Sequence, residues 1–324
     1  MIKTSATKLN TFLKTAIIVL VIFLTVFFNF TPQADAKDYV YAAPNASGEM
    51  TGEKKKPFKS IQRAIDAAEK DDKKVILLPG TYYENNIDLW DDVILDGLDK
   101  NKVTIIGENE HKAVITMYDD SEIQNLTIRN GKRGVYVAEN ADVLIWDCRI
   151  NDNDKDGIKV EEAKIDDKHR LNIQKTIIAY NGWNGIYAKQ RNFYLKDNFI
   201  YKNGWDGIEF DKNSEGTIKD TKIKENDGLG IRLTIDGSWI YIKDCTIRDN
   251  DKSGIEVRSK GGNGKISLDR KTKLYKNEDY GIVRLNDGTD KDQDYWNDHL
   301  KIDSDVRFWD NDKDPVSDII KVDC

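Results

Sequence analysis

An Asn followed four residues later by a Gly, and then by an Ile or Val, recurs along most of this sequence. Successive copies of the Gly are 22 to 28 residues apart. The seven complete copies are Asn130/Gly134, Asn153/Gly157, Asn181/Gly185, Asn203/Gly207, Asn226/Gly230, Asn250/Gly254 and Asn277/Gly281. In an eighth copy, Asn311 is followed at the same offset by Pro315. A repeat of this period is typical of a solenoid.

Each repeat unit also alternates apolar and polar residues after its Gly. The first and third residues are apolar, as in Ile158/Val160 and Ile208/Phe210, and the residue between them is polar. This period of two indicates a strand with one buried face. Units of this length leave no room for a helix beside the strands, which excludes an α-solenoid. The sequence therefore predicts an all-β, single-stranded parallel β-helix in which each unit forms one coil.

Stacking of the coils in register predicts a ladder of Asn side chains. Equivalent residues would lie about 4.8 Å apart, so the amides are expected to hydrogen-bond from coil to coil. We expect the Asn, or the Gly after it, to adopt a left-handed backbone in the turn. Cys148 and Cys245 fall in one inward slot four coils apart, which at roughly 19 Å excludes a disulfide between them.

The region before the regular repeats predicts a capping helix at about residues 57–70. There Phe58, Ile61, Ala64, Ile65 and Ala68 share one helical face. Such a helix would cover the open end of the first coil, whose strand is expected in "KKVILL". Apolar clusters between 74 and 130 suggest about three less regular coils, and the regular coils are expected over about 120–315.

The first 36 residues have the pattern of a secretory signal peptide. Three Lys precede the apolar run 16–28, and Ala34-Asp35-Ala36 offers a cleavage site. An uncleaved signal anchor is the alternative. Cleavage leaves 37–324 as one domain, in which Lys+Arg falls from 50 to 47 and Asp+Glu from 57 to 56, giving a net charge of −9. We expect an acidic, secreted or cell-surface monomer that does not bind nucleic acid and is not inserted in a membrane. The sequence gives no role for Cys324.

The combination of "PFKSIQRAIDAA", "VILLPGTY" and the Asn-x-x-x-Gly coils resembles the right-handed parallel β-helix proteins of the pectate-lyase-like superfamily. The resemblance covers 38–324 and implies a right-handed coil and a polysaccharide partner. That superfamily includes lyases, glycoside hydrolases, uronate epimerases and non-catalytic surface proteins. The Asp-Pro-His-Asp string of alginate epimerases and the Gly-His-Gly string of polygalacturonases are absent here. Asp206-Gly207-Ile208-Glu209 is similar to the Asp-Gly-x-Asp segment of calcium-dependent lyases, with Glu in place of the last Asp.

Alternation predicts which side chains face outward after each Gly, and these are the candidate site residues. The lyase hypothesis assigns Ca²⁺ to Asp206, Glu209 and Asp211. It makes Lys189 the base that removes a proton, with Arg232 as the second candidate catalytic residue. Tyr187 and Arg258 on the same face are candidate substrate-binding residues. The segments 161–171 and 258–266 are expected to wall a groove there.

Two alternatives use the same residues differently. In the first, the charges form ladders of ion pairs, Glu209–Arg232–Glu256 in one column and Lys189–Asp211 in the other, with no catalysis. In the second, Glu209 and Glu256 form a hydrolase pair roughly 9–10 Å apart. Arg232 between them disfavours this hydrolase, because it keeps both carboxylates ionised.

Trp183 and Trp205 occupy equivalent turn positions in adjacent coils and are expected to stack. Exposed indoles there could bind sugar rings, or they could merely pack over the Asn column. The sequence thus predicts a secreted β-helix protein that recognises polysaccharide, as a Ca²⁺-dependent lyase of uronate polymers. The alternative is a non-catalytic carbohydrate-binding or surface protein. A glycoside hydrolase or an epimerase is the less favoured enzyme.

Overall fold

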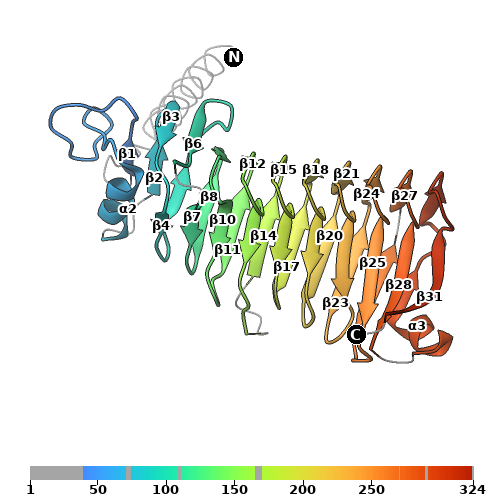
Figure 1. The fold of residues 1–324 in the computed structure, drawn as a ribbon. Coiled ribbons are helices and arrows are strands. Elements are labelled where there is room, and N and C mark those ends of the chain that lie inside the picture. Colours follow the sequence, from blue (N-terminus) through green and yellow to red (C-terminus); the bar gives the residue numbers. More distant parts are fainter. Residues whose placement is uncertain are drawn as a thin grey trace, which may run out of the picture. The chain divides into compact units, whose positions relative to one another are not determined.

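The computed structural model describes residues 39–70, 74–108, 111–164, 170–269, 271–288 and 291–322. In these ranges the chain winds through three parallel β-sheets in turn, and each coil adds one strand to every sheet (Figure 1). The strands shown from blue to red follow one another along a single axis. The predicted all-β parallel solenoid is confirmed. The predicted signal peptide and Cys324 lie outside the described residues.

The three sheets are named here in the order in which a coil visits them. Sheet 1 contains β1 (Tyr39–Ala42), β2 (Lys74–Leu77), β5 (Ile94–Asp96), β8 (Ser121–Gln124), β11 (Val143–Trp146), β14 (Arg170–Gln174), β17 (Asn192–Lys196), β20 (Glu215–Lys219), β23 (Trp239–Lys243), β26 (Lys265–Asp269) and β29 (Leu300–Ile302). Sheet 2 contains β3 (Gly80–Tyr83), β6 (Val103–Ile106), β9 (Thr127–Arg129), β12 (Arg149–Asn151), β15 (Ile177–Ala179), β18 (Phe199–Tyr201), β21 (Lys222–Lys224), β24 (Thr246–Arg248), β27 (Lys273–Tyr275) and β30 (Arg307–Trp309). Sheet 3 contains β4 (Ile87–Leu89), β7 (Ala113–Met117), β10 (Arg133–Val137), β13 (Ile158–Val160), β16 (Ile186–Ala188), β19 (Ile208–Phe210), β22 (Ile231–Thr234), β25 (Ile255–Ser259), β28 (Ile282–Asp287) and β31 (Val316–Val322).

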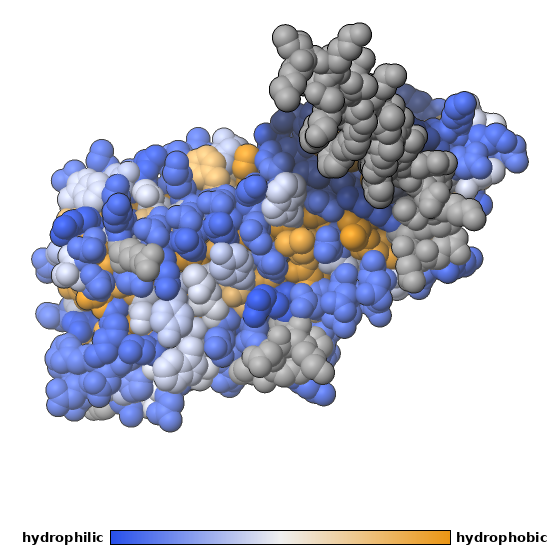
Figure 2. All heavy atoms as spheres, turned by 180° about the vertical axis from the view of Figure 1, so that it is seen from behind, coloured by the Kyte–Doolittle hydropathy of each residue, from blue (hydrophilic) through white to orange (hydrophobic). Residues whose placement is uncertain are grey.

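The core is a set of aliphatic columns inside the coils. One column joins fully buried residues of sheet 2 in strict register: Ile150, Ile178, Ile200, Ile223 and Ile247. Each buried Ile contributes about 1.5–3 kcal/mol relative to an exposed one. The polar residues between them face outward, and the reverse side of the molecule is mostly hydrophilic with a band of hydrophobic side chains through its middle (Figure 2).

The Asn ladder runs through the turn between sheets 2 and 3. Each side-chain amide donates to the side-chain oxygen of the next Asn at 2.9–3.0 Å, through Asn153, Asn181, Asn203, Asn226, Asn250, Asn277 and Asn311. Asn130 was expected in this column but is exposed. Gly131 takes the place beside Asn153, because its backbone N–H donates to the Asn153 oxygen at 3.0 Å.

The left-handed residue of each regular turn is the one before the ladder Asn. Asp152 and Lys202, for example, both have φ of 54°. The expectation that the ladder Asn or the Gly would adopt this backbone is therefore wrong, except for Asn130, whose φ is 61°. Close packing explains the Gly instead. A Cβ on Gly185 would lie 2.6 Å from the carbonyl oxygen of Gly207 in the next coil.

Two cysteines lie in a second polar column beside this core. Cys148 and Cys245 are buried and free, as expected. Their backbone N–H groups donate to the hydroxyls of Thr176 and Thr272 at 3.3 and 3.4 Å. Small polar side chains at this slot therefore satisfy the backbone of the preceding coil.

Helix α2 (Ile61–Glu69) lies within the range predicted for the capping helix, but Phe58, which was expected on its face, precedes it and bridges to Ala42. The helix buries Ile61, Ala64, Ile65 and Ala68 against β1, β2 and β4. Two backbone N–H groups of its first turn donate to Glu84 at 2.7 and 3.0 Å. The negative charge of Glu84 also stabilises the helix by interacting with the positive end of its dipole. Strand β1 precedes the helix and was not expected, so "KKVILL" supplies the second strand of sheet 1 rather than the first.

A second helix, α3 (Gln293–His299), lies between β28 and β29 and was not predicted. Asp292 caps its N-terminus, and the buried Trp296 donates from Nε1 to Asn286 at 3.0 Å. No helix in the described ranges is long and apolar enough to cross a membrane.

Candidate functional site

A column of polar side chains runs across the outer face of sheet 3. Its members are paired in register from β13 to β25: Lys159, Tyr187, Glu209, Arg232 and Glu256. This column is the one that alternation predicts. Neighbours are one coil apart, about 4.8 Å, so each side chain can contact those above and below.

Arg232 holds three carboxylates. Its guanidinium lies 3.4 Å from Glu209, 3.1 Å from Glu256 and 3.1 Å from Asp206. The contact with Asp206 Oδ2 is an ion pair by distance without the alignment of a hydrogen bond. The expected Glu209–Arg232–Glu256 ladder is therefore confirmed, and Asp206 joins it from the preceding turn.

Burial and charge act against each other in this cluster. Burial raises the pKa of Asp206 and of Glu209, and Arg232 opposes the rise in both. Burial tends to lower the pKa of Arg232, but its three carboxylates outweigh this and hold the pKa above its usual value. Arg232 is thus permanently charged, and its guanidinium is already paired with carboxylates of the protein. It is therefore suited to positioning these side chains rather than to accepting a proton.

The described residues do not fit the predicted Ca²⁺ site. Asp206 receives a hydrogen bond from the Leu229 backbone N–H at 2.8 Å and faces Arg232 with its other oxygen. Asp211 accepts a hydrogen bond from the Tyr187 hydroxyl at 3.1 Å. Within the described ranges no three acidic, His or Cys side chains are placed to hold a metal ion together. A cation at the centre of the cluster is already present in Arg232.

Lys189 has a different partner from the one expected. Its ammonium lies 2.5 Å from Glu161, so the expected Lys189–Asp211 pair is wrong. The hydrogen bond to Glu161 raises the pKa of Lys189. Because a base must be unprotonated to remove a proton, this arrangement disfavours the predicted base role of Lys189.

Tyr187 lies between a cation and an anion. Lys159 places its ammonium 3.6 Å from the centre of the Tyr187 ring, and the hydroxyl donates to Asp211. Burial raises the pKa of Tyr187, and the charge of Asp211 raises it further. The phenol is therefore neutral at physiological pH, and Lys159 covers one of its ring faces.

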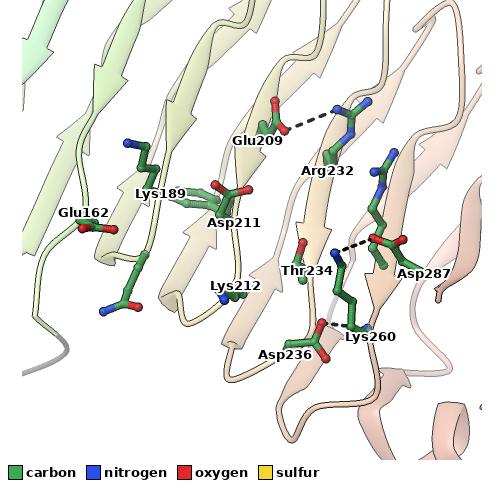
Figure 3. Close-up of a pocket in the computed structure, with 13 residues that line it drawn as sticks. Glu162, Lys189, Glu209, Asp211, Lys212, Arg232, Thr234, Asp236, Lys260 and Asp287 are labelled. Atoms are coloured by element: carbon green, nitrogen blue, oxygen red, sulfur yellow. Dashed lines mark hydrogen bonds and ion pairs between the residues drawn. The ribbon is translucent and has the colours of Figure 1, made fainter. Parts of the chain in front are cut away.

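A groove of about 350 Å³ lies beside this column (Figure 3). It brings together the candidates Lys189, Glu209, Asp211, Arg232 and Arg258, of which Arg258 donates to Glu256 at 2.6 Å. Two other lining residues, Glu162 and Lys260, come from the segments 161–171 and 258–266, which were expected to wall the groove. The structure describes the first of these segments only in part. Five cationic and five acidic residues line the groove, so its charge is balanced.

Trp183 and Trp205 stack as expected, with ring centres 5.1 Å apart and planes 8° from parallel. The ammonium of Lys155 lies 4.0 Å from the centre of the Trp183 ring. Trp205 is 52% exposed, whereas Trp183 is half-buried. Only one of the two indoles therefore offers an open ring face to a ligand.

Comparisons with known proteins agree with this geometry. The model of the right-handed β-helix region matches residues 163–292, and no curated protein matches the sequence. Among solved structures, pectate lyase Pel9A is 11% identical over 87% of this chain and 78% of its own, with a TM-score of 0.55. The A-module of the Azotobacter vinelandii mannuronan C-5 epimerase AlgE4 is 17% identical over 86% of this chain and 97% of its own, with a TM-score of 0.54.

A third similar structure is tailspike protein 2 of Escherichia coli O157:H7 bacteriophage CAB120. It is 15% identical over 76% of this chain and 39% of its own length, with a TM-score of 0.55. The chain has a right-handed parallel β-helix fold, which it shares with these three structures. Identities this low show the fold alone, so the activity of this β-helix is argued from its own residues.

Sequence reasoning predicted that turns between sheets 3 and 1 wall the groove, but it missed several side chains that line the groove beside them, among them Asp236 and Asp287. There the Lys260 ammonium pairs with Asp287 at 3.5 Å, and the Lys260 backbone N–H donates to Asp236 at 2.8 Å (Figure 3). Lys212 also lines the groove and makes no ion pair with the described residues. The extra length of these turns is the only signal of them in the sequence, and it does not say which side chains turn toward the groove.

Proposed function

We propose that the protein binds a polysaccharide chain along the groove of sheet 3 and does not cleave it. The observation that carries the proposal is the groove itself, which lines up cationic, acidic and hydroxyl side chains at the spacing of the coils. Sugar hydroxyls both donate and accept hydrogen bonds, so a lining with equal numbers of cations and carboxylates suits them. The names of two proteins with the same fold, a pectate lyase and a mannuronan epimerase, support a polysaccharide as the partner.

The state of the charged groups supports binding over catalysis. Lys189 and Arg232 each have a pKa raised by the carboxylates beside them, so neither is suited to accept a proton. Glu209 and Glu256 share the Arg232 guanidinium. Burial raises the pKa of Glu209, but Arg232 opposes this rise and so works against a general acid at Glu209. We also propose that the protein acts outside the cell, as its N-terminal segment predicts.

The test is a panel of neutral and uronate polysaccharides, each added to the purified protein with and without Ca²⁺. Calorimetry measures binding, and absorbance of unsaturated uronates and reducing ends are followed in the same samples. We expect binding without new products and without a Ca²⁺ requirement. Unsaturated products that depend on Ca²⁺ would establish the lyase instead, and reducing ends alone would establish the hydrolase.

A groove variant localises the binding. Arg258→Ala combined with Lys260→Ala removes two cations of the lining, and Lys222→Ala on sheet 2 removes an exposed cation elsewhere. We expect the double variant to bind about tenfold more weakly, with Lys222→Ala equal to the unmodified protein. Equal affinity of all three proteins would refute the groove as the binding site.

A further inference from the structure

A second column of side chains crosses the turn just outside the Asn ladder. It comprises the residues two positions after the five ladder Asn from Asn153 to Asn250, and backbone N–H···O bonds of 3.0–3.2 Å join them from coil to coil. In order they are Lys155, Trp183, Trp205, Gly228 and Lys252. Each position of the column is filled by a large side chain except the fourth.

The stack of this column is open at one end. Lys155 covers one face of Trp183, and Trp205 covers the other. The remaining face of Trp205 is directed toward the next coil, where the column has Gly228 and no side chain. The exposure of Trp205, 52%, is consistent with this uncovered ring face.

Gly228 keeps this space empty. A Cβ at this position would lie 2.4 Å from Oδ1 of Asp206 and 2.9 Å from the carbonyl carbon of Trp205. That Asp206 oxygen already accepts the Leu229 backbone N–H, so it is not free to move away. A side chain therefore cannot fill the position without disturbing the turn.

The result is a notch of about 240 Å³ between Trp205 and Lys252. The two residues are two coils apart, about 9–10 Å, which leaves one coil's thickness for a ligand ring. Arg232 and Asp206 line the notch but are already paired with each other. Lys252 and Asp227, which are both exposed, remain as one donor and one acceptor for a ligand.

We propose that this notch binds a single pyranose residue of a glycan, with the apolar face of the sugar stacked on Trp205. The hydroxyls of the sugar would lie toward Asp227 and Lys252. A lining with one free charge of each sign favours a neutral sugar over a uronate. This inference rests on the proposed polysaccharide-binding function and extends it, because Arg232 lines both the groove and the notch, which therefore adjoin.

The experiment measures the affinity of the full protein for neutral gluco-, manno- and xylo-oligosaccharides and for oligouronates. The variants are Trp205→Ala and Trp205→Phe, with Trp239→Ala on sheet 1 as the matched control, since Trp239 is 46% exposed. We expect Trp205→Ala to lose about tenfold in affinity for a neutral oligosaccharide, with a smaller loss for Trp205→Phe, which keeps an aromatic face. Trp239→Ala should bind normally.

A second readout does not depend on affinity. Sugar stacking should change the tryptophan fluorescence of the unmodified protein, and Trp205→Phe should abolish that change while its thermal unfolding temperature stays the same. If Trp205→Ala binds as tightly as the unmodified protein while the double groove variant is weakened, the notch is not a subsite and the proposed function survives. If Trp239→Ala weakens binding as much as Trp205→Ala does, the proposed sugar site in the notch is also refuted. Failure of every oligosaccharide and polysaccharide to bind would overturn both proposals.

Discussion

Replacing Asn226 by Ala tests whether the Asn ladder stabilises the coils. Asn226 is fully buried in the middle of the ladder. Its side-chain oxygen accepts the backbone N–H of Asn203 at 3.1 Å and the Asn203 amide at 3.0 Å. Its own amide donates to Asn250 at 2.9 Å. The substitution therefore removes three hydrogen bonds at once.

The cost follows from which groups are left without partners. The backbone N–H of Asn203 becomes buried and unsatisfied, which costs about 1–3 kcal/mol. The Asn203 amide retains the Ile178 carbonyl at 3.4 Å, and the Asn250 oxygen retains the backbone N–H of residue 226 at 3.2 Å. Adding the two amide–amide bonds at about 1 kcal/mol each, we expect a total loss of about 3–5 kcal/mol in the free energy of unfolding.

Urea unfolding of three variants measures this loss. Asn311→Ala removes the last ladder residue, which is only half-buried, so water can replace part of what is lost and the expected cost is about 1–2 kcal/mol. Asn172→Ala on the outer face of sheet 1 should change the free energy by about 0.5 kcal/mol or less. Hydrogen exchange at the backbone N–H of Asn203 should accelerate in Asn226→Ala. A cost for Asn226→Ala within about 1 kcal/mol of that for Asn172→Ala would refute the reasoning.

Three further predictions concern the cation cluster, the close packing of the turns and the buried thiols. Arg232→Ala should cost about 3 kcal/mol or more at pH 7, because it leaves buried carboxylates without their cation. Two of those carboxylates already have raised pKa values, so the folded variant should take up protons more readily than the unfolded chain, and urea unfolding should show a smaller penalty at pH 4 than at pH 7. Gly185→Ala should lower the unfolding temperature, since its Cβ meets the carbonyl of the next coil at 2.6 Å, and an unchanged temperature would contradict the packing argument. Burial raises the pKa of Cys148 and Cys245 to about 12, so a Cys324→Ser variant should give no reaction with a thiol reagent when folded and two labelled thiols in denaturant.

The repeat predicted the fold well because a parallel β-helix converts sequence period directly into spatial columns. Once the Asn positions align, register determines that Glu209, Arg232 and Glu256 are neighbours and that Trp183 meets Trp205. These contacts join equivalent positions of adjacent coils, so a one-dimensional pattern is enough to find them. The aliphatic columns and the two free cysteines follow from the same alignment.

The errors lie where the column leaves a choice of partner or does not apply. Lys189 pairs with Glu161 on the preceding coil side rather than with Asp211, and a long side chain's choice between two carboxylates depends on its rotamer. Asp206 reaches Arg232 from a turn, which strand alternation does not describe. The left-handed turn residue was predicted wrongly because Asn and Gly both suit a left-handed conformation. The Gly is instead required by the close approach of the next coil, and the residue before the ladder Asn has the left-handed backbone. Strand β1 and helix α3 lie outside the repeat and were missed.

The spacing of the ladder has a consequence for how this chain can change in length. Asn203 and Asn226 are 23 residues apart, and the strands on either side of them pair in register with those of the next coil. Removal of those 23 residues would make Asn203 the ladder neighbour of Asn250 and keep the remaining columns in register. Removal of a few residues inside a strand would instead shift that strand relative to its neighbours and break the columns it belongs to. Changes of a few residues are therefore confined to the turns, whose lengths already differ between coils, and the strands can change only by a whole coil. A change of one coil between Trp205 and Lys252 would resize the notch without altering the other columns.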